Sequence, residues 1–285
     1  MAATGSNDTA GIGDPYWYEW SIGLTRVLDM LDPTNGIKTV TIQADELQGL
    51  DDVVVDYHDG RRRCVQVKHT REAASITFGD LMGAEGLLTA LAVPWRAARE
   101  AGHPCTAELY TNRSVGRRAW KRQDGGLSRP ALDVFWPHLK SEAGVRSTLD
   151  EIEMPAAWSD GWAEWKAALN ALTSDEQLQF IRSLEIVWNS PGLEETEEQL
   201  KQQLQFLFSC SNAQAIELLS ALDTALRKWT TTRRSTPGIT EETAYSALSL
   251  PTEAEISNHL IAPPEPFFPS RVQFCDALTT TLRSP

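Results

Sequence analysis

The sequence lacks any long apolar run, and no stretch approaches the 18 apolar residues of a membrane-spanning helix. No apolar segment follows Met1, so we expect neither a signal peptide nor a membrane span. The four cysteines are far apart and form no Cys-x-x-Cys pair: Cys64, Cys105, Cys210 and Cys275. This spacing argues against structural zinc and against a disulfide framework. We therefore expect a cytoplasmic protein with reduced thiols.

Several catalytic motifs are also missing. The chain has no phosphate-binding Gly-rich loop, no Gly-x-Ser-x-Gly sequence and no pair of histidines at metal-ligand spacing. Its five histidines are scattered along the chain. These absences argue against a P-loop nucleotidase, a serine hydrolase of the nucleophile-elbow type and a histidine-based zinc enzyme, and they leave acidic and amide side chains as the chemistry to examine.

The charge distribution is uneven. The 285 residues are 41% hydrophobic and 23% charged, which is ordinary for a globular protein, but the net charge is −13. Residues 61–122 nevertheless carry 12 Lys or Arg against 5 Asp or Glu, whereas the rest carries 14 against 34. A local basic surface on an acidic chain can still bind phosphates, weakly and in a salt-dependent way, although a solvated basic loop is the alternative.

Residues 49–70 (GLDDVVVDYHDGRRRCVQVKHT) contain the most informative pattern. The β-branched and aromatic run at 53–57 is followed by Asp59 and Gly60, and a second apolar run begins at Cys64. Two such runs joined by Asp-Gly predict a β-hairpin.

The polar residues of this hairpin stand in suggestive positions. Asp51 and Asp52 precede the first strand, and Gln66 and Lys68 share one face of the second strand because they are two residues apart. An unpaired ammonium is costly to bury, so a purely structural strand gains little from this pair. Carboxylate and carboxamide oxygens can hold a divalent cation, and a lysine can stabilise a charged nucleophile.

This arrangement resembles the PD-(D/E)XK nuclease family in its Gln-X-Lys variant. It is most similar to effector nucleases of bacterial antiphage defence: those of CBASS systems, of Avs-type sensors and of systems paired with HerA-type ATPases. The matching residues are Gly49-Leu50-Asp51-Asp52 and Gln66-Val67-Lys68-His69. The resemblance covers about the first two fifths of the chain and only loosely the rest.

The resemblance implies a metal-dependent endonuclease that cleaves double-stranded DNA with Mg²⁺ or Mn²⁺. Asp52, and Asp51 beside it, would bind the cation. Gln66 would add an amide oxygen in place of the usual glutamate, and Lys68 would stabilise negative charge on the nucleophile or phosphate.

Glu19, on the first predicted helix, would complete the set of metal ligands, although a surface glutamate is an equal alternative. Glu46 is a second acidic candidate, but a turn residue is the preferred interpretation. The resemblance also implies activation by a sensor or ATPase partner. Because self-association or a partner assembly would multiply weak DNA-binding sites by avidity, we expect an oligomer in the active form.

The fold class predicted is α/β (α+β), a restriction-endonuclease-like mixed sheet flanked by helices, followed by a mostly helical region. The pattern predicts a helix from Asp14 to about Leu31, a strand at 37–44, helices at 77–91 and 95–101 separated by Pro94, and a strand at 106–111. A strand that follows a crossover helix is expected to pair in parallel with the hairpin.

Basic residues follow the last strand, with an amide and Trp120 among them. We predict that six of these residues contact DNA: Asn112, Arg113, Arg117, Arg118, Lys121 and Arg122.

The predicted organisation has four parts: a disordered N-terminus at 1–13, the nuclease core at 14–125, a helical region at 126–261, and a Pro-rich segment with a tail at 262–285. Within the helical region, the spacing of Trp158, Trp162 and Trp165 predicts a core-facing helix, and 184–188 predicts a short strand.

Two other functions compete with an active nuclease. One is a catalytically silent nucleic-acid-binding or scaffolding module that keeps the nuclease fold. The other is a helical interaction domain in which the hairpin is merely structural.

Overall fold

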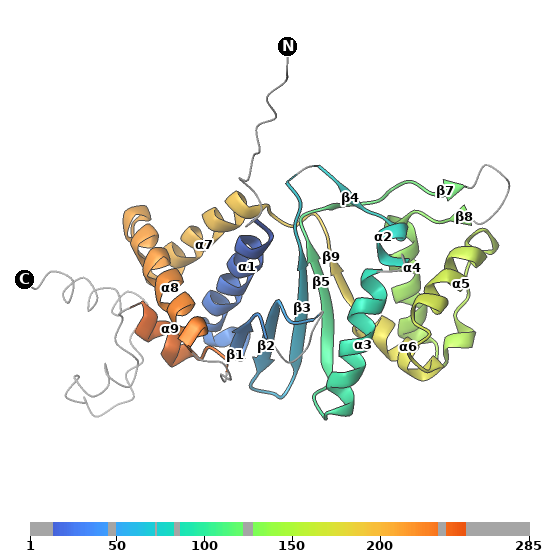
Figure 1. The fold of residues 1–285 in the computed structure, drawn as a ribbon, viewed down its shortest axis with the longest axis horizontal. Helices are drawn as coiled ribbons and strands as arrows, with labels where there is room; N and C mark the ends of the chain where they lie inside the picture. The colour runs from blue at the N-terminus through green and yellow to red at the C-terminus, as the bar shows by residue number, and fades with distance from the viewer. Residues whose placement is uncertain are drawn as a thin grey trace, which may run out of the picture. The chain divides into compact units, whose positions relative to one another are not determined.

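The computed structural model describes residues 14–44, 50–71, 73–82, 86–121, 128–232 and 238–248. The predictions for the N-terminal residues 1–13, for Glu46, Gly49 and Arg122, and for the Pro-rich segment and tail at 262–285 lie outside these ranges. Within them the fold is a mixed sheet flanked by helices, with further helices toward the C-terminus, as the sequence predicts (Figure 1).

The main sheet contains five strands within the described residues, in the order β1-β2-β3-β5-β9. Their bounds are β1 Ile37–Ile42, β2 Val53–Tyr57, β3 Arg62–Lys68, β5 Cys105–Thr111 and β9 Glu185–Val187. Each coincides with a strand predicted from the sequence to within two residues. Short strands form two further ladders: β4 Ser75–Ile76 with β6 Ser114–Val115, and β7 Trp120–Lys121 with β8 Ser128–Arg129.

Helices make up much of the rest of the described chain. Their bounds are α1 Asp14–Met30, α2 Phe78–Met82, α3 Leu87–Glu100, α4 Leu132–Val145, α5 Ser159–Ala168, α6 Ser174–Ser183, α7 Leu193–Phe208, α8 Asn212–Thr232 and α9 Glu241–Ala247. Three 3₁₀ turns accompany them at Pro33–Asn35, Leu149–Glu151 and Ala156–Trp158. None of the described helices is long and apolar enough to cross a membrane.

The predicted hairpin turn lies between β2 and β3. Gly60 adopts a φ of 86°, which favours glycine over any residue with a Cβ, and its N–H donates to the carbonyl of Tyr57 at 3.1 Å. The Asp-Gly signal in the sequence therefore marks a real conformational requirement.

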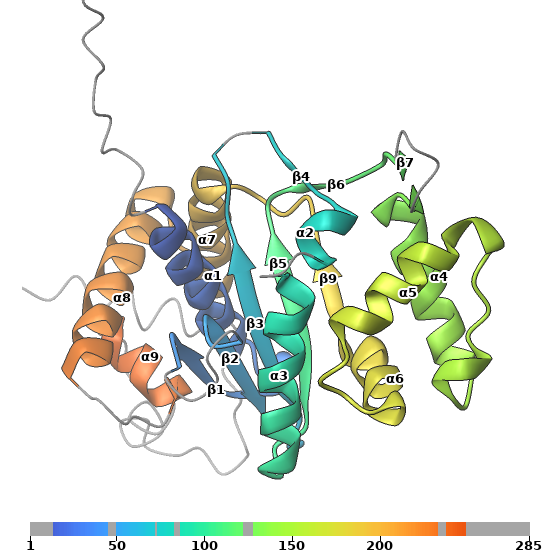
Figure 2. The ribbon, with the colours of Figure 1, turned by 45° about the vertical axis from the view of Figure 1, so that its right-hand side comes forward.

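Strands β3 and β5 pair in parallel, and this pairing determines where chain segments meet. Their register runs from Arg62 opposite Cys105 to Lys68 opposite Thr111. A parallel pair needs a crossover connection, which α2 and α3 supply, and α3 lies along β5 in both views (Figures 1 and 2). The carboxyl ends of β3 and β5 consequently lie at one edge of the sheet.

The predicted break at Pro94 is wrong, because α3 runs through it as one helix. Proline has no N–H and costs one intrahelical hydrogen bond, but packing can compensate for this loss. Leu91 and Trp95 flank Pro94 and are both about 1% exposed or less. Burial on both sides of the proline holds the two halves of the helix in one line.

The chain divides into two compact units that are discontinuous in sequence. Unit 1 consists of residues 1–19, 43–54 and 61–192, and unit 2 of residues 20–42, 55–60 and 193–285. This grouping of contacts does not test where an independently folding domain begins, so the boundary near residue 125 stays a prediction. In unit 2, α7 packs against α8, and α8 against α9.

An aromatic cluster fills part of the core of unit 1. Trp165 is fully buried, and its ring centroid lies 5.4 Å from that of Phe135 and 5.5 Å from that of Trp136. Trp158 and Trp162 are only partly buried and pack at the border of this core. The predicted tryptophan face is therefore buried at one position and half-buried at the other two.

Helices α4 and α6 cap each other's C-terminal ends. Lys140 on α4 donates to the carbonyls of Arg182 and Leu184, both at 2.8 Å, at the end of α6. Arg182 in turn donates to the carbonyl of Ala143 near the end of α4 at 2.7 Å and to that of Arg146. Each helix end thus gains a cation where its backbone carbonyls lack intrahelical partners.

Glu108 provides a test of polar burial in the sheet. Its side chain is fully buried, and its Oε2 lies 2.7 Å from Nη1 of Arg63, which is 33% exposed. We expect Arg63→Met to lower the free energy of unfolding by about 2–3 kcal/mol, because it leaves a buried carboxylate without this partner. Urea denaturation measures the change.

The double variant Arg63→Met, Glu108→Gln serves as the control and should recover most of the lost stability. A single-variant loss below about 0.5 kcal/mol would contradict a stabilising role for this pair.

Candidate functional site

Asp52 stands immediately before β2, and its carboxylate is held by the neighbouring strand. One of its oxygens, Oδ2, accepts the backbone N–H of Val67 at 2.6 Å and also the side-chain amide of Gln66. Val67 belongs to β3, so the hydrogen bonds fix the carboxylate against the strand that carries the predicted Gln66 and Lys68. Asp52 is half-buried, and burial raises the pKa of its carboxyl, opposed by the Val67 N–H and by the charge of Lys68.

Gln66 and Lys68 occupy the same face of β3, as predicted. Gln66 is only 7% exposed and turns its amide nitrogen to Asp52, whereas Lys68 is half-buried at the last position of the strand. The Lys68 ammonium acts electrostatically on the carboxyls of both Asp52 and Glu19. The face is therefore partly buried, and its polar groups interact with one another.

Glu19 joins this cluster from α1. Burial and the nearby charge of Asp52 raise the pKa of Glu19 to about 7, while a hydrogen bond from Gln43 and the charge of Lys68 oppose this rise and Asp51 adds to it. These interactions bring Glu19 to the two aspartates of the motif. Glu19 is half-buried among charged partners, and its role as a metal ligand stays a prediction.

Gln43 is a member of the cluster that sequence reasoning missed. It follows β1 and adopts a φ of 54°, which is rare for a residue other than glycine and is frequent at functional sites. Its backbone N–H donates to the carbonyl of Asp52 at 2.9 Å, and the next residue, Ala44, donates to that of Asp51 at 2.7 Å. Gln43 therefore connects Glu19 to the motif aspartates, and its only sequence signal is its place at the end of a predicted strand.

The six polar residues of the site, named here the acidic cluster, all belong to unit 1: Glu19, Gln43, Asp51, Asp52, Gln66 and Lys68. Its donors are hard oxygens, which suit Mg²⁺ or Mn²⁺. No group of three or more His, Cys, Asp or Glu side chains arranged to hold a metal ion occurs in the described part of the chain.

His69 and Tyr18 border the acidic cluster. Their ring centroids are 4.6 Å apart, and the Tyr18 hydroxyl donates to the carbonyl of Pro191 at 2.8 Å. Because Tyr18 precedes Glu19 on α1 and His69 follows Lys68, this contact fixes the backbone next to both charged residues.

Asn112 has a structural partner that the sequence did not reveal. Its amide oxygen accepts the N–H of Thr70 at 2.9 Å and its amide nitrogen donates to the carbonyl of Thr70 at 2.7 Å. The side chain thereby continues the pairing of β3 with β5 beyond the ends of both strands. The predicted phosphate contact of Asn112 would have to compete with these two bonds.

Three other predicted DNA contacts follow the carboxyl end of β5: Arg113, Arg117 and Arg118. Arg113 lies 3.8 Å from a carboxylate oxygen of Asp80, and Arg117 and Arg118 line a pocket next to β6. Lys121 lies in β7, and its side chain, like Arg122 as a whole, is outside the described atoms. Arg113, Arg117 and Arg118 therefore all lie in the segment that follows β5, and their contact with DNA stays a prediction.

Comparison with known proteins adds no relative. No protein-family model matches the chain, and no curated protein matches it significantly.

The raised pKa of Glu19 predicts how stability depends on pH. Below about pH 4.5 the carboxyl is protonated in both the folded and the unfolded chain; between 4.5 and 7 only the folded chain keeps the proton, so stability falls as the pH rises. We expect Glu19→Gln to raise the free energy of unfolding by about 1–2 kcal/mol at pH 8, after discounting for partial solvent exposure, and to change it little at pH 4. Urea denaturation in EDTA at the two pH values measures this difference.

Glu217→Gln, at an exposed position of α8, is the matched control and should behave like the wild type at both pH values. An equal effect of Glu19→Gln at pH 4 and pH 8 would show that its carboxyl does not titrate in this range.

Proposed function

We propose that the chain is a metal-dependent endonuclease that hydrolyses phosphodiester bonds of double-stranded DNA. One observation carries the proposal: Asp52, Gln66 and Lys68 converge at the end of β3, and Glu19 joins them from α1. Polar groups of these types are costly to bury, and a hydrolytic site gives a reason for burying them together.

The cluster residues have distinct roles in this proposal. Asp52 and Glu19 would hold Mg²⁺ or Mn²⁺, with Asp51 and the amide oxygen of Gln66 as further ligands. A bound cation would polarise the scissile phosphate and lower the pKa of the water bound to it. Because Glu19 keeps its proton up to about pH 7, the metal-free site must release that proton when a cation binds, so metal affinity should rise with pH.

Lys68 would act on the reacting groups. Its ammonium lies at the carboxyl end of β3, and it can stabilise the negative charge that grows on the attacking oxygen and on the phosphate. Gln66 contributes no charge where the family has glutamate, so the site should bind its cation more weakly. Its amide nitrogen orients the Asp52 carboxylate instead.

The biological setting follows from the resemblance alone. In this setting, the nuclease is an effector of bacterial antiphage defence that is held inactive until a sensor or an ATPase partner activates it. The matching residues at Asp51, Asp52 and Gln66–His69 support this setting.

A catalytically silent DNA-binding or scaffolding module is the second candidate. The observation that favours it is the hydrogen bond from Gln66 to Asp52, which engages the carboxylate with a neutral partner. Such a module would bind DNA but would not cleave it.

Lys68→Ala should abolish plasmid cleavage in Mn²⁺ while leaving folding and DNA binding nearly intact. The expected loss in rate is about 10²-fold or more, because the charge acts mainly on the transition state. A plasmid-cleavage time course, a gel shift and a thermal melt separate these effects. Lys38→Ala, at an exposed position of β1, is the matched control and should cleave as the wild type does. Unchanged cleavage by Lys68→Ala would remove this residue from the site.

Asp52→Ala tests the metal site without relying on activity. Mn²⁺ should raise the melting temperature of the wild type, because a ligand that binds only the folded state stabilises that state. At a hundredfold excess of ligand over Kd, the free energy of unfolding rises by about 2.7 kcal/mol. The variant should show no such rise. Equal stabilisation of both proteins by Mn²⁺ would place the cation elsewhere.

A further inference from the structure

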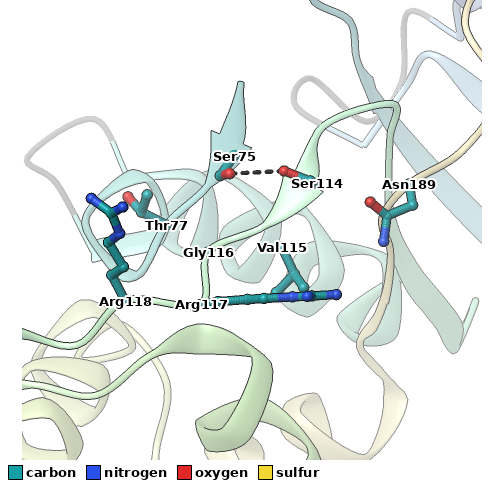
Figure 3. A pocket seen from close by; sticks show the side chains of 8 residues that line it. All are labelled: Ser75, Thr77, Ser114, Val115, Gly116, Arg117, Arg118 and Asn189. Carbon is teal, nitrogen blue, oxygen red and sulfur yellow. Dashed lines mark hydrogen bonds between the residues drawn. The ribbon is translucent and has the colours of Figure 1, made fainter. Parts of the chain in front are cut away.

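A second site lies beyond the acidic cluster, in the segments that follow the carboxyl ends of β3, β5 and β9. It is a pocket of about 630 Å³ between the short ladder of β4 and β6 and the residue that follows β9 by two positions (Figure 3). Its polar lining residues are Ser75, Thr77, Ser114, Arg117, Arg118 and Asn189. We name it the arginine pocket.

The hydroxyl groups of the arginine pocket are engaged with the protein. Ser75 and Ser114 hydrogen bond each other at 2.8 Å, and the Thr77 hydroxyl donates to Asp80 at 2.7 Å. The side-chain hydrogen-bond donors left for a ligand are therefore the two guanidinium groups and the Asn189 amide.

Both arginines are exposed, and neither has an ion pair with any other described residue. In Figure 3 the Arg117 side chain runs in the direction of Val115 and Asn189, while Arg118 lies on the side of Thr77. No carboxylate belongs to the lining, so the charge of the described lining is that of two cations. Guanidinium groups bind phosphate through paired N–H donors, which makes a phosphate the best-matched ligand.

The backbone of the pocket is tightly constrained. A Cβ at Gly116 would lie 2.9 Å from the carbonyl oxygen of Ile76, so only glycine allows the two segments to approach this closely. Asn189 adopts a φ of 56°, and its N–H donates to the carbonyl of Arg113 at 2.9 Å. These constraints fix the backbone at Gly116, next to Arg117, and at Asn189 before any ligand binds, which lowers the entropy cost of binding.

The size of the pocket limits the ligand. A volume of about 630 Å³ is within the range of sites for small organic molecules and exceeds what a lone phosphate needs. A nucleotide unit combines a phosphate with a body of suitable size, and the exposed polar side chains leave the pocket open to the solvent.

We propose that the arginine pocket binds one nucleotide unit, with its phosphate held by Arg117 and oriented by the Asn189 amide, while Arg118 adds positive charge from the side of Thr77. The unit can belong to a DNA strand or be a free nucleotide, because the phosphate chemistry is the same. The strand form rests on the proposed function, whereas the free form does not. Binding itself needs neither the metal nor the acidic cluster.

The test is binding in EDTA, where cleavage cannot occur. The probes are thymidine 5′-monophosphate and thymidine by isothermal titration calorimetry, and a fluorescein-labelled 16-base-pair duplex by fluorescence anisotropy. The proteins are the wild type, Arg117→Gln with Arg118→Gln, and Arg61→Gln as a control for charge at the opposite end of β3. Asn189→Asp is the second variant, since aspartate tolerates the same backbone conformation and adds a repelling charge.

We expect about a tenfold loss of affinity for each arginine removed, a further loss for Asn189→Asp, and wild-type behaviour for Arg61→Gln. Binding of the monophosphate but not of thymidine would identify a free-nucleotide site. Binding of the duplex alone, with the slope of log K against log salt reduced by about 0.9 for each lost phosphate contact, would identify a strand site. The proposal is overturned if neither phosphate-bearing probe binds the wild type, or if the double arginine variant and Asn189→Asp bind both probes as tightly as the wild type does.

Failure of the pocket and failure of the nuclease are distinguishable. If cleavage in Mn²⁺ is absent while arginine-dependent binding in EDTA persists, only the proposed function fails. If cleavage depends on Lys68 but binding is independent of both arginines, only the pocket fails.

Discussion

The parallel pairing of β3 with β5 is the constraint on which the rest of unit 1 depends. It requires the crossover through α2 and α3, and it brings Lys68 opposite Thr111. The segments that leave these two strands must then begin at one edge of the sheet. They continue together in the second parallel ladder of β4 with β6, and Asn112 fills the gap between the two ladders by pairing with the backbone of Thr70.

The same edge concentrates groups that are unfavourable for folding. Asp52 and Glu19 both have raised pKa values, chiefly because burial disfavours their charged forms. Gln43 and Asn189 both adopt left-handed backbone conformations there. A fold under selection for stability alone has little reason to collect such features at one edge, whereas a site that recognises charge does.

The sequence predicted the fold well because its signals were local. The Asp-Gly turn and the β-branched runs each act through neighbouring residues, and the structure contains the corresponding hairpin and strands. Pro94 misled the prediction, since its cost is local but the compensating burial of Leu91 and Trp95 is tertiary.

The site was predictable only in part, for a related reason. Asp52, Gln66 and Lys68 could be connected because a hairpin brings its two strands together at known spacing. Gln43 reaches the site through a backbone conformation that sequence alone does not report, and Asn112 is used by the backbone of a segment 42 residues away. The arginine pocket depends on three chain segments that meet only after the sheet forms, so no single stretch of sequence indicates it.

The mutual capping of α4 and α6 has a consequence for how the chain opens. Lys140 binds the carbonyl of Leu184, the residue directly before β9, so the last turn of α6 and the beginning of the edge strand share one cation. If α6 detached, it would leave carbonyls without donors at the ends of both helices, and the strand that follows would lose its anchor. Local fluctuations of these three elements are therefore coupled, and their amide protons should exchange with solvent as one cooperative block, with a common opening free energy.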